Sequence, residues 1–205
     1  MKKSPLVIIG CGGHAISCID VIEQENKFEI VGLIGCAGTN DGGIYRYPMI
    51  GFDNELESLV RSYPNAFIGI GQIKSSHARY EFYEKLISIG YELPTIISPS
   101  AYVSPHAEVG KGSIVMHGAI INAGAIVGKN CIINSKALIE HGAIVGDHCH
   151  ISTGSKVNGD VRIGYGSFIG SSACIKEGAY IGNNCIVGMG LAVRHNLPDN
   201  TLFVG

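Results

Sequence analysis

The sequence is poor in charged residues and contains no tryptophan. Aspartate, glutamate, lysine and arginine make up 16% of its 205 residues, well below the usual quarter. Fifteen basic residues stand against 17 acidic ones, for a formal net charge of −2. Proteins that bind nucleic acid or an anionic membrane surface usually carry a basic excess. The composition therefore supports neither kind of partner.

Long apolar runs and paired cysteines are also missing. The basic start of the chain leads into four apolar residues, Leu6–Ile9, too few for a secretion signal or a membrane-spanning helix. Seven cysteines occur, an odd number, and no two stand in a Cys-x-x-Cys arrangement. This usage argues against a disulfide framework. We expect a reduced, cytoplasmic protein.

The second half of the chain repeats with a period of six. From Val103 to Val193 every sixth residue is valine or isoleucine, and the residue two places earlier is mostly small. Helical and plain strand periodicities cannot give this pattern, whereas a short strand and a tight corner, three times per coil, can. Because strand side chains alternate, the β-branched and small residues point inward. The repeat predicts about five stacked coils of a parallel β-helix.

The residue before each inward position should face outward, and most of these residues are large and apolar. Residues 18 apart stack, so one outward column contains Ile114, Ile132, His150, Phe168 and Ile186. A monomer rarely exposes contiguous apolar columns of this kind. We expect an oligomer, with the alternative that the N-terminal domain covers some of the columns.

One corner of the repeat places a histidine between small neighbours. The corner column reads Ala123, His141, Gly159, Glu177 and His195. Small residues on either side leave a cleft around the His141 imidazole. Histidine is suited to general-base catalysis because it titrates near neutral pH. Beside it Asn122, Glu140 and Asn158 form a polar ladder that could orient a site.

The first 97 residues alternate strand-like and helix-like segments, which favours a Rossmann-like α/β domain with a parallel sheet. The strand at Leu6–Ile9 runs into a glycine turn and then a helix with Ile16, Ile19 and Ile22 on one side. Further strands are expected at residues 28–34 and 66–71, and a helix at 80–89. We divide the chain into an α/β domain at 1–97 and an all-β domain at 98–205.

The glycine turn could also be part of a dinucleotide-binding fingerprint. An acidic residue should then end the second strand and bind the ribose, but Gly35 stands there. An NAD-linked reductase is therefore a weak alternative.

The hexapeptide pattern, the segment Glu140-His141-Gly142 and the turn Gly12-Gly13-His14 together resemble the NeuD/PglD-type sugar acyltransferases. The resemblance implies a left-handed β-helix, acetyl-CoA as cosubstrate, and a homotrimer with active sites between subunits. The implied acceptor is a sialic acid or a nucleotide-linked amino sugar, in surface polysaccharide or glycan biosynthesis. His141 would be the general base. Many relatives have an acidic residue directly after it; here Gly142 takes that place, so a carboxylate partner must be another group such as Glu140.

The resemblance also assigns ligand contacts. It implies that His150 contacts the acetyl-CoA thioester and that the backbones of Ser171 and Met189 line the pantetheine path. The nucleotide sugar would bind at Gly12, Gly13 and His14, with Gly71 at the border of the same crevice. Two other functions stay open. One is a scaffold or chaperone for a sialic-acid enzyme; the other is a zinc-dependent carbonic anhydrase, whose histidine spacing we do not find, so no metal is expected.

Overall fold

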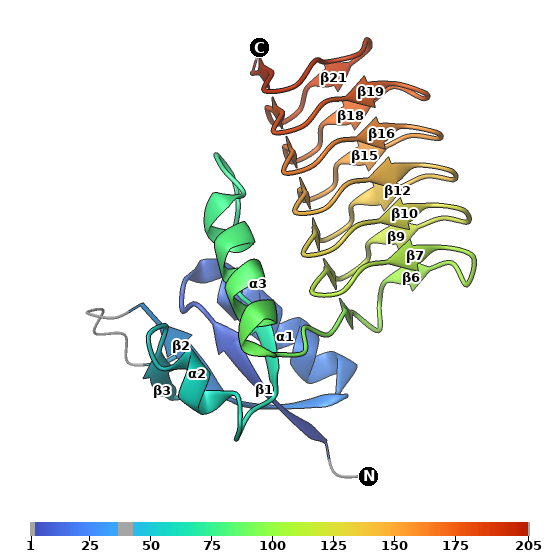
Figure 1. Ribbon diagram of the computed structural model, residues 1–205. Coiled ribbons are helices and arrows are strands. Elements are labelled where there is room, and N and C mark those ends of the chain that lie inside the picture. Colours follow the sequence, from blue (N-terminus) through green and yellow to red (C-terminus); the bar gives the residue numbers. More distant parts are fainter. Residues whose placement is uncertain (1–2, 37–42, 205) are drawn as a thin grey trace.

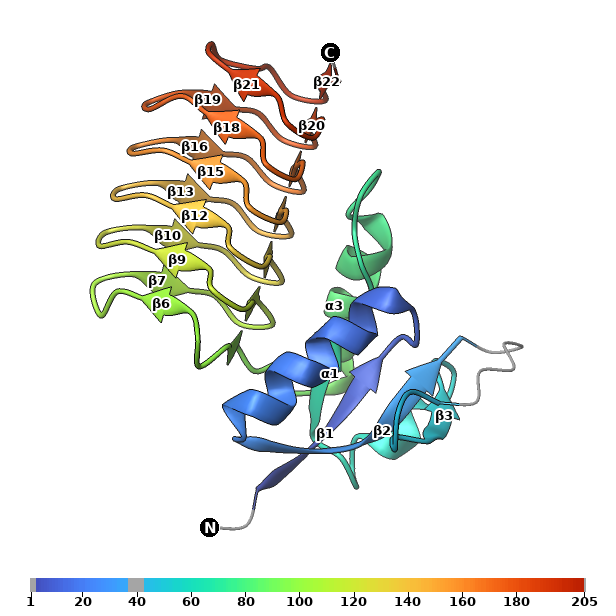
Figure 2. The same cartoon turned by 180° about the vertical axis from the view of Figure 1, so that it is seen from behind.

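The computed structural model describes residues 3–36 and 43–204, which form an α/β domain packed against a β-helix (Figures 1 and 2). The α/β domain contains a parallel sheet of four strands in the order β3-β2-β1-β4. These strands are β1 (Ser4–Ile9), β2 (Phe28–Gly35), β3 (Met49–Phe52) and β4 (Asn65–Ile68). Its helices are α1 (Gly13–Glu25), α2 (Leu56–Leu59) and α3 (His77–Ile89).

The helices bury opposite faces of this sheet. Helix α1 packs on the face that carries Leu6 and Ile8, and α3 packs on the face that carries Val7 and Ile9. The predicted strands and helices are present, although α3 begins at His77, earlier than expected. One core prediction is wrong: Ile16 is 41% exposed. It lies one turn before Ile19 and Ile22 in α1, outside the stripe that the sheet covers.

The rest of the chain winds into a left-handed β-helix with three parallel sheets, as the repeat predicted. The seven-stranded sheet contains β5 (Ile96–Ile97), β8 (Ile114–Val115), β11 (Ile132–Ile133), β14 (His150–Ile151), β17 (Phe168–Ile169), β20 (Ile186–Val187) and β22 (Leu202–Phe203). The six-stranded sheet contains β6 (Tyr102–Val103), β9 (Ile120–Ile121), β12 (Leu138–Ile139), β15 (Lys156–Val157), β18 (Cys174–Ile175) and β21 (Ala192–Val193). The five-stranded sheet contains β7 (Glu108–Val109), β10 (Ile126–Val127), β13 (Ile144–Val145), β16 (Arg162–Ile163) and β19 (Tyr180–Ile181).

The hexapeptide register fixes the core of the β-helix. Strands pair with a constant offset of 18 residues, for example Ile132 with His150. The inward valines and isoleucines from Val115 to Val193 form one buried cluster together with the small residues two places before them. Three cysteines lie in the small slots and are fully buried, namely Cys131, Cys149 and Cys185. The inward and outward assignment from the sequence is confirmed.

The α/β domain covers the seven-stranded sheet from β5 to β14, whereas Leu202 on the last strand, β22, is 64% exposed. Ile114 and Ile132, both outward-facing, are fully buried in the cluster that also contains the residues of α1. The first strand of this sheet, β5, ends at Ile97, next to the predicted division of the chain at 97/98. One of the apolar columns is therefore covered within the chain, which was the alternative to an oligomer contact at that face. Ile120 and Ile126, on the other two sheets, are 40% and 41% exposed.

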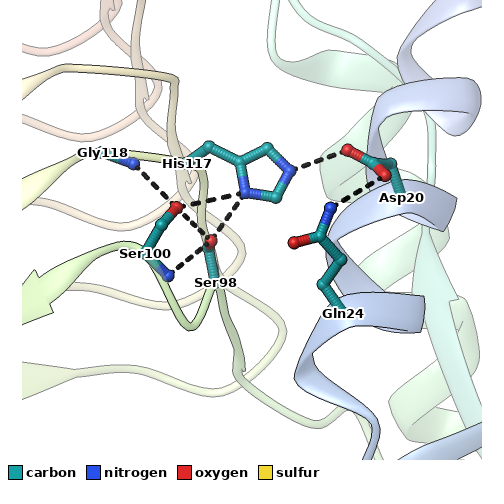
Figure 3. A network of polar contacts seen from close by, with 6 residues as sticks. All are labelled: Asp20, Gln24, Ser98, Ser100, His117 and Gly118. Carbon is teal, nitrogen blue, oxygen red and sulfur yellow. Dashed lines mark hydrogen bonds and ion pairs between the residues drawn. The ribbon is translucent and has the colours of Figure 1, made fainter.

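A polar network joins α1 to the first coils of the β-helix (Figure 3). His117 Nε2 lies 2.8 Å from Asp20 Oδ2, and its Nδ1 lies 2.7 Å from Ser98 Oγ. Gln24 donates to Asp20 from the same helix, and Ser100 contacts Ser98. This network is one of the polar contacts between α1 and the β-helix.

Candidate active site

A cavity of about 690 Å³ opens at the carboxyl ends of β1, β2 and β4. Three segments at the ends of these strands line it, at residues 10–14, 34–36 and 69–73. Strand order reverses between β1 and β4, since the chain moves outward to β3 and then returns to the other side of β1. Ligands of open α/β sheets usually bind at this kind of switch point.

Glycines keep the backbone of the cavity open. A Cβ added to Gly12 or Gly13 would meet no atom within 4 Å, so their backbone faces open space where α1 begins. The free N–H groups of a helix N-terminus suit an anionic group such as a phosphate. A Cβ on Gly71 would lie 3.3 Å from the Cβ of His14, so this glycine leaves room for the histidine. All four residues predicted from the glycine turn and its border line the same cavity.

His14 brings a neutral imidazole to the cavity. Its Nε2 is buried and has no hydrogen-bond partner among the described residues. Burial, with smaller contributions from the positive charge of Arg79 and from His150, lowers the pKa of His14 to about 3. The ring therefore stays uncharged at neutral pH, and its buried Nε2 keeps an unsatisfied hydrogen-bonding position.

His150 links this cavity to the β-helix. Its Nδ1 lies 2.6 Å from the Gln72 carbonyl oxygen, which can only accept, so Nδ1 carries the hydrogen. The other nitrogen, Nε2, then accepts from Asn134 Nδ2 at 3.1 Å. Burial lowers the pKa of His150 to about 4. Because the residue is only 7% exposed and both nitrogens are engaged, its predicted contact with a thioester stays a prediction.

Sequence reasoning missed Arg79, which is fully buried and has no carboxylate partner among the residues that the structure describes. Its guanidinium donates to the carbonyl oxygens of Ile68 and Ile70, at 2.8 and 2.6 Å, and to Asn130 Oδ1 at 2.6 Å. It thereby ties the turn after β4 to a corner of the β-helix. Desolvation lowers the pKa of Arg79 to about 10, so the group stays charged at neutral pH. The available signal was an arginine in the helical stripe that also contains Tyr83 and Leu86.

His141 lies at an exposed corner, and its imidazole stacks over Gly159. A Cβ added to Gly159 would lie 2.7 Å from Cε1 and 2.8 Å from Nε2 of the ring. The small neighbour expected from the repeat is therefore required for this ring position. Glu140 Oε2 accepts from Asn122 Nδ2 at 2.9 Å and from the backbone N–H of His141 at 3.3 Å. Glu140 thus holds the backbone of the histidine and makes no hydrogen bond to its ring.

The cavity and His141 do not meet within one chain. His141 follows β12 at the corner that leads to β13, between the six- and five-stranded sheets. The α/β domain covers the remaining, seven-stranded sheet, on the side of the prism opposite this corner (Figure 2). Ser171 and Met189 follow β17 and β20 at another corner, where Met189 is 80% exposed and Ser171 Oγ lies 3.0 Å from Ser152 Oγ.

Comparison with known proteins matches both halves of the chain. Residues 5–86 match the PglD N-terminal domain, and residues 124–158 and 160–194 match the hexapeptide repeat of succinyl-transferase. A histidine variant of perosamine N-acetyltransferase from Caulobacter crescentus, solved with CoA and GDP-perosamine, is 32% identical with a TM-score of 0.92. The alignment covers 98% of this chain and 94% of that one. The chain belongs to the NeuD/PglD-type family of sugar acyltransferases.

A second structure of similar architecture is the acetyltransferase domain of PglB from Neisseria gonorrhoeae, solved also with acetyl coenzyme A. It is 28% identical with a TM-score of 0.89, over 97% of this chain and 95% of that one. WeeI from Acinetobacter baumannii shares the fold at 21% identity and a TM-score of 0.86. No curated protein matches the chain.

Within residues 3–36 and 43–204, no group of three histidine, cysteine, aspartate or glutamate side chains is arranged to hold a metal ion. No helix in the same ranges is long and apolar enough to cross a membrane.

Proposed function

We propose that this chain transfers an acetyl group from acetyl-CoA to a hydroxyl or amino group of a nucleotide-linked sugar or a sialic acid. The observation that carries the proposal is the imidazole of His141, held at an open β-helix corner over Gly159. Membership of the acyltransferase family supports it, as do the related structures that contain acetyl-CoA, CoA and GDP-perosamine. The enzyme would work in surface polysaccharide or glycan biosynthesis in the cytoplasm.

The cavity of the α/β domain is the proposed acceptor site. Its volume of about 690 Å³ falls in the range of small-molecule sites. The backbone at Gly12 and Gly13 would bind the diphosphate or carboxylate of the acceptor at the start of α1. His14, whose imidazole is neutral, would form part of the wall of this site. Gly71 borders the same space and keeps His14 in position.

In the proposed reaction His141 is the general base. It takes the proton from the acceptor hydroxyl or amine while that atom attacks the thioester carbonyl carbon. The resulting oxyanion needs N–H donors, which the corner backbone can supply. As the carbon–sulfur bond breaks, the imidazolium returns its proton to the sulfur, and free CoA leaves. Ser171 and Met189 are proposed to line the path of the pantetheine arm, and His150 to support the thioester end through Asn134.

The separation of the cavity from His141 within one chain supports an active site that a second subunit completes. We propose a homotrimer in which the cavity of one subunit faces the His141 corner of the next. Exposed apolar residues on the two uncovered sheets, among them Ile120, Ile126 and Tyr180, supply surface for such contacts. Each active site would then lie between subunits.

An acceptor panel tests the proposal. Acetyl-CoA is mixed with N-acetylneuraminic acid, its cytidine-linked form, GDP-perosamine and uridine-linked amino sugars. Release of free thiol and the product mass are then followed. We expect one class to gain 42 mass units, the mass of an acetyl group replacing hydrogen, and His141→Ala to lose at least about a hundredfold in turnover. Thiol release without an acetylated product, or full turnover of His141→Ala, would contradict the proposal. Micromolar NAD binding without nucleotide-sugar binding in calorimetry would instead favour a reductase.

A further inference from the structure

A carboxylate from the next coil lies against the residue that follows His141. The backbone N–H of Asp160 donates to the carbonyl oxygen of His141 at 3.1 Å, so the two coils are paired at this corner. A Cβ built on Gly142 would lie 2.3 Å from Asp160 Oδ1. The Asp160 carboxylate therefore occupies the space in which a side chain at Gly142 would begin.

The side chains of His141 and Asp160 extend between these two neighbouring coils in opposite directions. The ring of His141 reaches up onto Gly159, while the Asp160 side chain reaches back onto Gly142. Because Gly159 and Asp160 are consecutive, their Cα atoms are about 3.8 Å apart. No hydrogen bond or ion pair engages the Asp160 carboxylate among the described residues, whereas Glu140 is held by Asn122 and by the backbone. Asp160 is thus the carboxylate that remains available at this corner.

We propose that Asp160 is the positioning residue for His141: its carboxylate orients the imidazole and stabilises the positive charge that the ring gains when it accepts a proton. The inference rests on the proposed acetyl transfer. A nearby carboxylate favours the charged form of an imidazole, and a hydrogen bond between the two would hold one ring orientation. The other ionisable groups in the three columns of this corner are Glu140, which directly precedes His141, and five groups two or three coils away, namely His106, Lys176, Glu177, Arg194 and His195. These five groups lie too far from His141 to orient its ring.

The first test replaces the carboxylate with an amide. Asp160→Asn should lower kcat by about 10- to 100-fold, the usual effect of losing an orienting partner, with little change in KM for acetyl-CoA. The acidic limb of the kcat profile should move to lower pH, since loss of a negative charge makes protonation of the base less favourable. The matched control is Glu177→Gln, which removes an exposed carboxylate from the same corner column and should stay within about twofold.

The second test exchanges the residues at positions 142 and 160. Gly142 and Asp160 occupy the same corner slot in successive coils, with φ of 66° and 56°, so each residue type fits either position. Gly142→Asp alone would overlap the Asp160 carboxylate and should lose activity. Asp160→Gly alone should resemble Asp160→Asn. The double variant Gly142→Asp/Asp160→Gly removes the overlap and restores a carboxylate, so kcat should return to within about threefold of the parent. Failure of this rescue, with a retained fold, would overturn the inference.

A measurement without any acceptor separates this inference from the proposed function. Diethyl pyrocarbonate modifies neutral imidazoles, and peptide mass spectrometry reports modification of His141 alone. Near pH 6, about the pKa of histidine, Asp160→Asn should be modified faster at His141 than the parent and than Glu177→Gln. Equal rates would overturn the Asp160 assignment, as would loss of turnover in Glu140→Gln but not in Asp160→Asn. Faster modification together with full turnover of His141→Ala would leave the pairing intact and contradict the proposed function.

Discussion

Gly159→Ala tests the base assignment without removing the base. The added methyl carbon would lie 2.7 Å from Cε1 and 2.8 Å from Nε2 of His141. Ordinary carbon contacts are about 3.5–4.0 Å, so the ring must move by about 1 Å. Misplacing a reacting group by that distance costs about a hundredfold. We therefore expect kcat to fall by between about ten- and a hundredfold, with little change in KM for acetyl-CoA.

The backbone at this position should accept alanine. Gly159 is not among the described residues with a positive φ, so a side chain causes no conformational strain there. Thermal unfolding of Gly159→Ala should stay within a few degrees of the parent, while initial rates of thiol release report kcat. His141→Ala is the reference and should lose about 10²–10⁴ in turnover.

The double variant Gly159→Ala/His141→Ala decides whether the methyl group acts through the imidazole. If it does, the second substitution adds nothing, and the double variant turns over as slowly as His141→Ala. Two results would refute the reasoning. One is a Gly159→Ala enzyme within twofold of the parent. The other is a double variant whose kcat is lower than that of His141→Ala by the same factor by which Gly159→Ala alone lowers the kcat of the parent. The methyl group would then act independently of the imidazole.

Three further predictions concern assembly and stability. Ile126→Asp should convert the proposed trimer into monomers in light scattering, because it places an unpaired charge on an apolar contact surface; a trimer of unchanged mass would exclude that sheet from the interface. Arg79→Met should lower the free energy of unfolding by about 3 kcal/mol or more, because three buried acceptor oxygens would lose their donor. The exposed control Arg61→Met should change the free energy of unfolding by less than about 0.5 kcal/mol. The pKa values of His14 and His150, about 3 and about 4, lie below that of an unfolded histidine. The folded state therefore binds fewer protons, and stability present above about pH 6.5 is lost as pH falls toward 4; His150→Asn should flatten this dependence in thermal scans.

The hexapeptide register alone determined the β-helix. Each repeat is local, since a β-branched residue, a small residue and a corner recur in fixed order, and every coil meets only its neighbours. The repeat of six residues and the coil of 18 residues predict the inward residues, the buried cysteines and the small neighbour of His141. The strand–turn–helix order likewise predicted the parallel sheet and grouped Gly12, Gly13, His14 and Gly71, which line one cavity.

The contacts between the two domains depend on tertiary structure. Ile132 has the pattern of an exposed repeat position, yet it is fully buried because the α/β domain covers the seven-stranded sheet. Ile132→Asp would consequently disrupt domain packing and could not test the oligomer. His150 has the same outward pattern and is buried for the same reason, since Gln72 of the α/β domain lies against it.

Side-chain direction was likewise undetermined by sequence. Glu140 is adjacent to His141 in the chain and was the natural candidate for its partner, yet its carboxylate bonds the backbone of His141 and the amide of Asn122. Asp160 lies 19 residues after His141. It reaches the same corner because one coil takes 18 residues, which places Asp160 next to Gly142 in the following coil. A sequence with a period of six determines which residues share a corner. Which of these residues touch depends on their rotamers and on the position of the α/β domain. Both depend on packing between segments far apart in the sequence, so a local pattern cannot predict them.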